Sequence, residues 1–138
     1  MIDMETQLFN DIVTELKAKY AWASSVLFAN DYLVSAQKFP CVTIVERDNR
    51  TLSQAQHTAP EENYAVLDYE VNVYTNSKAK RKQEARTIAA AVDDAFIGRG
   101  FRRRIMEQIP NAEDWSVYRI VARYTAIADP DRTIYRRP

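Results

Sequence analysis

Four cationic residues stand within five positions of the chain, at Lys78, Lys80, Arg81 and Lys82. The surrounding pattern predicts that they occupy the start of a helix, where they would face the positive end of the helix dipole. Each cation in such a place costs a few tenths up to about 1 kcal/mol. Folding alone gives no reason to place four of them there, whereas a negatively charged partner would.

This basic cluster has two interpretations. The first is a solvated helix start, with Glu84 offsetting part of the charge. The second is contact with a phosphate backbone or with an acidic neighbouring subunit. No aromatic residue is interleaved within the cluster, which argues against recognition of single-stranded bases. Any contact with nucleic acid would therefore be independent of base sequence.

A second set of candidate residues lies on two predicted strands. Alternation places Arg119, Val121 and Arg123 on one face of a long strand, and Tyr74 stands near the end of another. Protein interfaces are enriched in tyrosine and arginine. These four residues therefore predict a contact surface between subunits.

The residues that most often perform catalysis are scarce. His57 is the only histidine and Cys41 the only cysteine, so no zinc site of the histidine–cysteine type can form. His57 lies in a polar segment without a rigid element that could hold it in a catalytic triad. We expect it to be solvated, and Cys41 to pack as a small apolar residue.

Two adjacent acidic pairs, Asp93-Asp94 and Glu61-Glu62, could suggest a site with paired carboxylates. Neighbouring residues on a helix point in different directions, so Asp93 and Asp94 do not form such a site by themselves. We expect both pairs to be solvated. The sequence thus predicts a protein that is not an enzyme, with no catalytic residues, no cofactor and no metal site.

The composition fits one soluble globular domain. The chain has 138 residues, of which 46% are hydrophobic and 28% charged, and its formal net charge is zero. Any role that depends on charge must therefore come from local patches. A single cysteine excludes an internal disulfide and fits a reducing compartment. The first residues lack a basic start and a continuous apolar run, so we expect no signal peptide. No window approaches the roughly 18 apolar residues of a membrane span, so we expect no membrane association.

The first half of the chain predicts one helix and two strands. Apolar residues recur every four positions over residues 4–20, with Asp3 as the N-cap. Residues 21–38 have no clear pattern. Residues 26–28 and 32–34 could form short strands or belong to a packed loop. Residues 41–46 and 64–75 predict strands. The polar residues 47–63 between them predict a protruding loop.

The second half predicts a helix followed by three strands. Asn76 or Ser77 would be the N-cap of the helix, and Gly98 or Gly100 would end it. Strands are expected at 101–109, 115–128 and 133–136. We therefore predict one α+β domain over residues 1–138. It would contain a single mixed or antiparallel sheet of four to five strands, with two helices packed on one face.

Several stretches in this order resemble small neck and tail-completion proteins of tailed bacteriophages. They are residues 39–46 (FPCVTIVE), residues 69–76 (YEVNVYTN), the basic-to-alanine helix, Gly100-Phe101-Arg102, Pro110-Asn111, and residues 118–124 (YRIVARY). The likeness is greatest to the tail terminators of long-tailed phages, and it covers about residues 39–136. The resemblance implies an α+β fold with a sheet flanked by helices.

The resemblance also implies a structural role without catalytic residues. Tail terminators form hexameric rings that cap the tail tube, stop its growth and join tail to head at the neck of the virion. Such a chain would be made in the host cytoplasm. Its partners would be further copies of itself, the tail tube protein, a head-completion or connector protein, and genome DNA that passes through the lumen without sequence recognition.

Two alternatives remain open at this stage. One is a head-completion or connector protein from the same neck region, which the sequence separates poorly from a tail terminator. The other belongs to a different class: a small DNA-binding module that uses Lys78, Lys80, Arg81 and Lys82. Such a module would bind duplex DNA with an affinity that falls steeply as salt rises.

Overall fold

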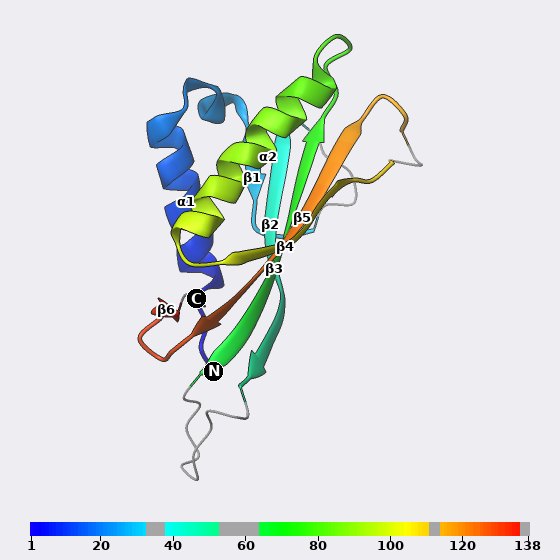
Figure 1. Cartoon of the computed structure of the whole chain (residues 1–138). Coiled ribbons are helices and arrows are strands. Elements are labelled where there is room, and N and C mark those ends of the chain that lie inside the picture. The colour runs from blue at the N-terminus through cyan, green and yellow to red at the C-terminus, as the bar shows by residue number, and fades with distance from the viewer. Residues whose placement is uncertain (33–37, 53–63, 111–113, 136–138) are drawn as a thin grey trace.

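The computed structural model describes residues 1–32, 38–52, 64–110 and 114–135 (Figure 1). Its elements, in chain order, are α1 (Glu5–Lys19), a 3-10 helix η1 (Ala21–Ser25), β1 (Leu27–Ala29), β2 (Cys41–Thr51), β3 (Ala65–Thr75), α2 (Arg81–Gly98), β4 (Arg102–Gln108), β5 (Tyr118–Ala128) and β6 (Ile134–Tyr135). No helix within the described ranges is long and apolar enough to cross a membrane.

The strands form one mixed sheet in the order β1-β2-β3-β5-β4, with β6 paired to the end of β5. β1 runs parallel to β2, and every other pair is antiparallel. Figure 1 shows α1 and α2 side by side on the same face of this strongly twisted sheet. The predicted α+β class is confirmed. The sheet has six strands rather than four to five, because the short β1, in the stretch where a strand and a packed loop were both open, also pairs with it.

The core lies between the two helices and the sheet. The alternate residues of β3 that face the helices are each at most 2% exposed: Ala65, Leu67, Tyr69, Val71 and Val73. α2 opposes them with small residues such as Ala85, Ala89 and Ala95, which allow the helix to approach the sheet closely. Near the end of α2, Phe96 stacks on Tyr124 of β5 with 4.3 Å between ring centroids.

The segment predicted as a loop at 47–63 begins as a strand, so that part of the prediction is wrong. β2 continues to Thr51 and pairs with the first half of β3, with a register shift between Glu46 and Asp48. This pairing gives the backbone N–H and C=O groups of the polar stretch their hydrogen-bond partners. At the surface, Arg50 forms ion pairs with both Asp48 and Asp68. The remainder of the predicted loop, including His57, Glu61 and Glu62, lies outside the described residues.

The starts of both helices differ from the predicted caps. The N-cap of α2 is Lys80, without a side-chain cap, because residues 78–80 form a turn before the helix begins. The helix begins at Arg81, so Asn76 and Ser77 lie before the N-cap and neither caps it, although the Ser77 carbonyl oxygen accepts a 3.1 Å hydrogen bond from the Arg81 backbone N–H. At α1 the N-cap is Met4 rather than Asp3.

Candidate interaction sites

The basic cluster lies where the chain enters α2. Lys78 and Lys80 stand in the turn before the helix, and Arg81 and Lys82 are its first two residues. The three lysines are exposed, and Arg81 is half-buried. The Thr75 hydroxyl at the end of β3 donates a 2.7 Å hydrogen bond to the Arg81 carbonyl oxygen, which ties the turn to the sheet. The structure thus presents these cations together at one end of the molecule (Figure 1).

An open groove connects this cluster with the start of β5. Lys78, Lys80, Arg81, Lys82, Gln83, Arg86, Gln108, Pro110, Trp115, Val117 and Tyr118 are among the residues that line it. We call this the basic groove. Five of its residues are cationic, and none of its described lining residues is acidic.

Trp115 gives the basic groove an aromatic wall that sequence reasoning missed. Residues 115–117 were expected in the long strand, but β5 begins at Tyr118. A turn forms instead, in which the Ser116 hydroxyl and backbone N–H both donate to Asp114 Oδ1, at 2.6 and 2.9 Å. These hydrogen bonds lower the pKa of Asp114. The turn leaves Trp115 79% exposed. No aromatic residue lies among the four cations in the sequence, but the fold places Trp115 in the same groove as them.

The second candidate set lies on the sheet face opposite the helices. Cross-strand pairing sets Tyr74 against Arg119, Asn72 against Val121 and Glu70 against Arg123. The structure therefore brings the four predicted residues to one face. Val121 is only 2% exposed, so it packs within the subunit and offers little surface to a partner.

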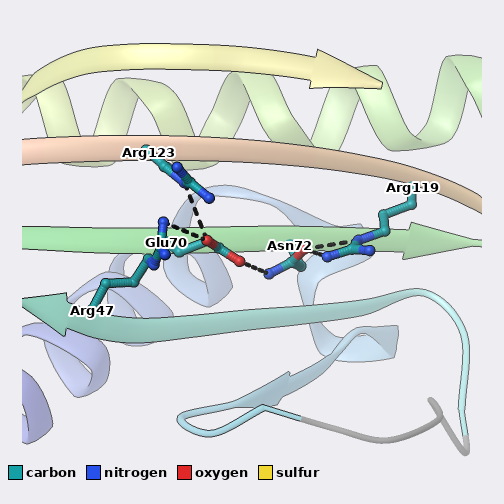
Figure 2. Close-up of polar contacts among 5 residues, drawn as sticks. All are labelled: Arg47, Glu70, Asn72, Arg119 and Arg123. Atoms are coloured by element: carbon teal, nitrogen blue, oxygen red, sulfur yellow. Dashed lines mark hydrogen bonds and ion pairs between the residues drawn. The ribbon is translucent and has the colours of Figure 1, made fainter. Parts of the chain in front are cut away.

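Glu70 is the centre of a polar network on this face (Figure 2). Its Oε2 lies 3.4 Å from Arg47 Nη1 and accepts a 3.2 Å hydrogen bond from Arg123 Nε. Its Oε1 accepts a 3.1 Å hydrogen bond from Asn72 Nδ2. The Glu70 side chain is 9% exposed, whereas those of Arg47 and Arg123 are 40% and 45% exposed. A buried carboxylate thus holds two arginines whose outer faces remain open to solvent.

Asn72 extends the network along the strands. Its Oδ1 accepts hydrogen bonds of 2.9 and 2.8 Å from Nε and Nη2 of Arg119. The Arg119 guanidinium carbon also lies 5.6 Å from the centroid of the Tyr74 ring, which is within the range of a cation–π contact. Within this network three arginines, Arg47, Arg119 and Arg123, stand against the single carboxylate of Glu70.

Tyr32 borders the same network. Burial and the Glu70 carboxylate raise the pKa of Tyr32, and Arg47 and Arg123 oppose that effect. The Tyr32 side chain is nevertheless about half exposed. Tyrosine and arginine therefore meet at an accessible surface, which is a combination that protein interfaces favour.

The prediction of a solvated Asp93-Asp94 pair is wrong for Asp93. Asp93 Oδ1 accepts a 2.8 Å hydrogen bond from the Tyr124 hydroxyl, and its Oδ2 lies 3.3 Å from Arg103 Nη1. Asp94 is exposed, as expected. Asp93 therefore connects α2 to the sheet and is engaged in structural contacts.

Cys41 is completely buried, as expected, and burial raises the pKa of its thiol. Across the described ranges, no group of three or more histidine, cysteine, aspartate and glutamate side chains is arranged to hold a metal ion. The two surfaces described above are therefore the candidate sites.

Comparisons with known proteins identify a shared fold. No protein-family model and no curated protein matches the sequence. A chain in the virion of a native gene transfer agent particle is similar in structure, with a TM-score of 0.59 and 18% identity, over 84% of this chain and 90% of that one. The gp17 protein of bacteriophage SPP1 is a weaker match, with a TM-score of 0.44 and 16% identity, over 88% and 89% of the two chains.

Proposed function

We propose that this protein is a structural subunit of a phage or phage-like virion and acts as a tail terminator at the head–tail junction. In this role several copies form a ring, expected to be a hexamer, that caps the tail tube and joins it to the head. The observation that carries the proposal is the fold shared with a virion chain over 84% of this chain and 90% of that one. The order of strand ends and turns that resembles tail terminators supports the same role.

The surfaces of the molecule fit an assembly protein. The network around Glu70 displays partly exposed arginines and Tyr32 on the sheet face opposite the helices, and the basic groove displays Trp115. A ring needs two different contact surfaces on each subunit. A neutral chain with separate charged surfaces can supply them without repelling its own copies through net charge.

Assembly and tail binding test the proposal separately. Native mass spectrometry and negative-stain images of concentrated protein should show closed rings. The protein should also bind purified tails that lack heads. A strict monomer that does not associate with tails would contradict the proposal. Binding to heads that lack tails would instead favour the head-completion or connector role.

One observation favours a function of another class, a DNA-binding module. The five cations of the basic groove have no acidic counterpart among its described lining residues. On this alternative the isolated protein would bind duplex DNA, with an affinity that falls steeply between low and high salt. Replacement of Lys78, Lys80, Arg81 and Lys82 by alanine would abolish the binding. Unchanged binding in that variant would exclude the alternative.

A further inference from the structure

The basic groove has a counterpart of opposite charge at the far end of the molecule. β5 starts at Tyr118, which lines the groove, and its last residue Ala128 is followed by the turn that contains Asp129 and Asp131. Eleven strand residues at about 3.3 Å each span roughly 35 Å. Figure 1 shows the start of α2 and the start of β5 at one end, and the N-terminus and the turn after β5 at the other.

Four aspartates lie on the two segments at this far end, and we call them the acidic end: Asp3 and Asp11 at and near the start of α1, and Asp129 and Asp131 in the turn after β5. A hydrogen bond of 2.6 Å from Arg132 Nη1 to Gln7 Oε1 ties the turn after β5 to the first turns of α1. Arg132 also lines a shallow depression with Asp3 and Asp11. Hydrogen bonds from the Thr133 and Asp131 backbones and the Tyr135 hydroxyl lower the pKa of Asp129, which keeps it negative. Asp3, Asp11 and Asp131 are exposed and Asp129 is half-buried, so the aspartates outnumber the one exposed cation among them, Arg132, by four to one.

We infer that the basic groove of one copy receives the acidic end of the next copy, in a head-to-tail contact with Trp115 as the apolar anchor. This inference rests on the proposed function, because it identifies the two surfaces through which the ring would close. The contact joins unlike surfaces, so it is heterologous, and it forms a ring when the rotation between successive copies closes. It also places carboxylates opposite cations that the dipole of α2 disfavours.

Trp115 favours a protein over DNA as the occupant. Phosphate contacts require only the cations, and they would leave the exposed indole in water. In duplex DNA the faces of the bases are already stacked on one another, whereas a protein surface can cover the ring. Buried tryptophans surrounded by polar residues are typical anchors of protein interfaces.

Charge reversal tests the contact. The groove variant carries Lys78→Glu and Lys82→Glu, and the end variant carries Asp11→Lys and Asp131→Lys. All four side chains are exposed and none forms an ion pair among the described residues, so both variants should fold. A third variant combines all four changes. The control is Lys38→Glu with Arg102→Glu, which changes the charge equally at two exposed side chains that form no ion pair among the described residues and lie outside the groove.

Sedimentation and native mass spectrometry would measure self-association at several protein concentrations. We expect the groove variant and the end variant each to associate at least roughly 100-fold more weakly than the wild type, because like charges would oppose one another. The combined variant should recover association, because its surfaces are again complementary. The control should behave as the wild type, and Trp115→Ala should weaken association by at least about tenfold.

Each other outcome has a distinct meaning. If the wild type forms rings and the groove variant forms them equally well, the inference is wrong and the proposed function stands. If the wild type neither self-associates nor binds tails, the proposed function itself fails. If the groove variant instead loses only salt-sensitive binding to duplex DNA, the occupant is nucleic acid, and the head-to-tail contact is excluded.

Discussion

The Tyr124 hydroxyl on β5 donates a 2.8 Å hydrogen bond to Asp93 Oδ1 on α2. The same tyrosine ring stacks on Phe96, one turn further along the helix, with the two planes 4° from parallel. Burial and the bond to Asp93 raise the pKa of Tyr124, so its hydroxyl keeps the proton that it donates. One residue of the sheet therefore holds α2 by an apolar and a polar contact.

These two contacts should contribute unequally to stability. Tyr124→Phe removes only the hydroxyl and leaves Asp93 paired with Arg103, so we expect a loss of about 1 kcal/mol in the free energy of unfolding. Phe96→Ala removes a completely buried ring and should cost about 3–5 kcal/mol. Urea denaturation at low protein concentration would measure both values. Equal losses in the two variants would contradict the expectation that the ring contact contributes more to stability than the hydrogen bond.

The two glycines near the end of α2 should respond in opposite ways to alanine. Gly100 adopts φ 95°, a conformation that an L-residue with a side chain rarely takes, so Gly100→Ala should lose about 1 kcal/mol or more. Gly98 is the last helical residue, and a Cβ there would meet no atom within 4 Å. Gly98→Ala should therefore be neutral or stabilise by up to about 1 kcal/mol. Thermal unfolding of the two variants would measure the contrast, and an equal loss in both would refute it.

Strong periodicity explains which elements could be predicted from the sequence. β3 alternates apolar and polar residues, and α2 carries a stripe that includes Ala85, Ile88 and Val92, so both elements and their buried faces were predictable. Residues 47–51 are polar and carry no such pattern. Their strand exists because the first half of β3 offers them a partner, which is a tertiary effect.

The candidate sites were only partly predictable for the same reason. Alternation alone placed Arg119, Val121 and Arg123 on one face, but the register that sets Glu70 against Arg123 follows from strand pairing. The position of Trp115 in the basic groove depends on a turn that the sequence pattern did not reveal. Whether either surface contacts a neighbouring subunit stays a prediction.

The Glu46 carboxyl should make stability depend on pH. Burial raises its pKa, the charges of Glu5 and Asp3 raise it further, and a 3.1 Å hydrogen bond from the Tyr69 hydroxyl opposes them. A carboxyl with a raised pKa binds its proton more tightly in the folded state. Its contribution to stability is therefore complete below the unfolded pKa of about 4.3, and it is lost as pH rises through the folded pKa.

Glu46→Gln removes this titration while the shape of the side chain is kept. We expect the variant to gain stability relative to the wild type as pH rises from about 4 toward neutrality. Urea denaturation at a series of pH values would measure the difference. Glu107→Gln on the exposed strand β4 is the matched control. A difference between Glu46→Gln and the wild type that stays constant over this pH range would show that Glu46 does not titrate in this way.

Glu70 should be the residue on which the polar network of the sheet face depends. Glu70→Gln keeps an acceptor for Asn72 but removes the charge that holds Arg47 and Arg123. Because both arginines are more than a third exposed, solvent screening reduces the expected loss to about 1–2 kcal/mol. The loss should shrink as salt rises, because ions screen the outer parts of the pairs. Glu107→Gln again serves as the control, and urea denaturation at low and high salt would measure both variants. An effect of Glu70→Gln no larger than that of the control would mean that the arginines are held in place without Glu70.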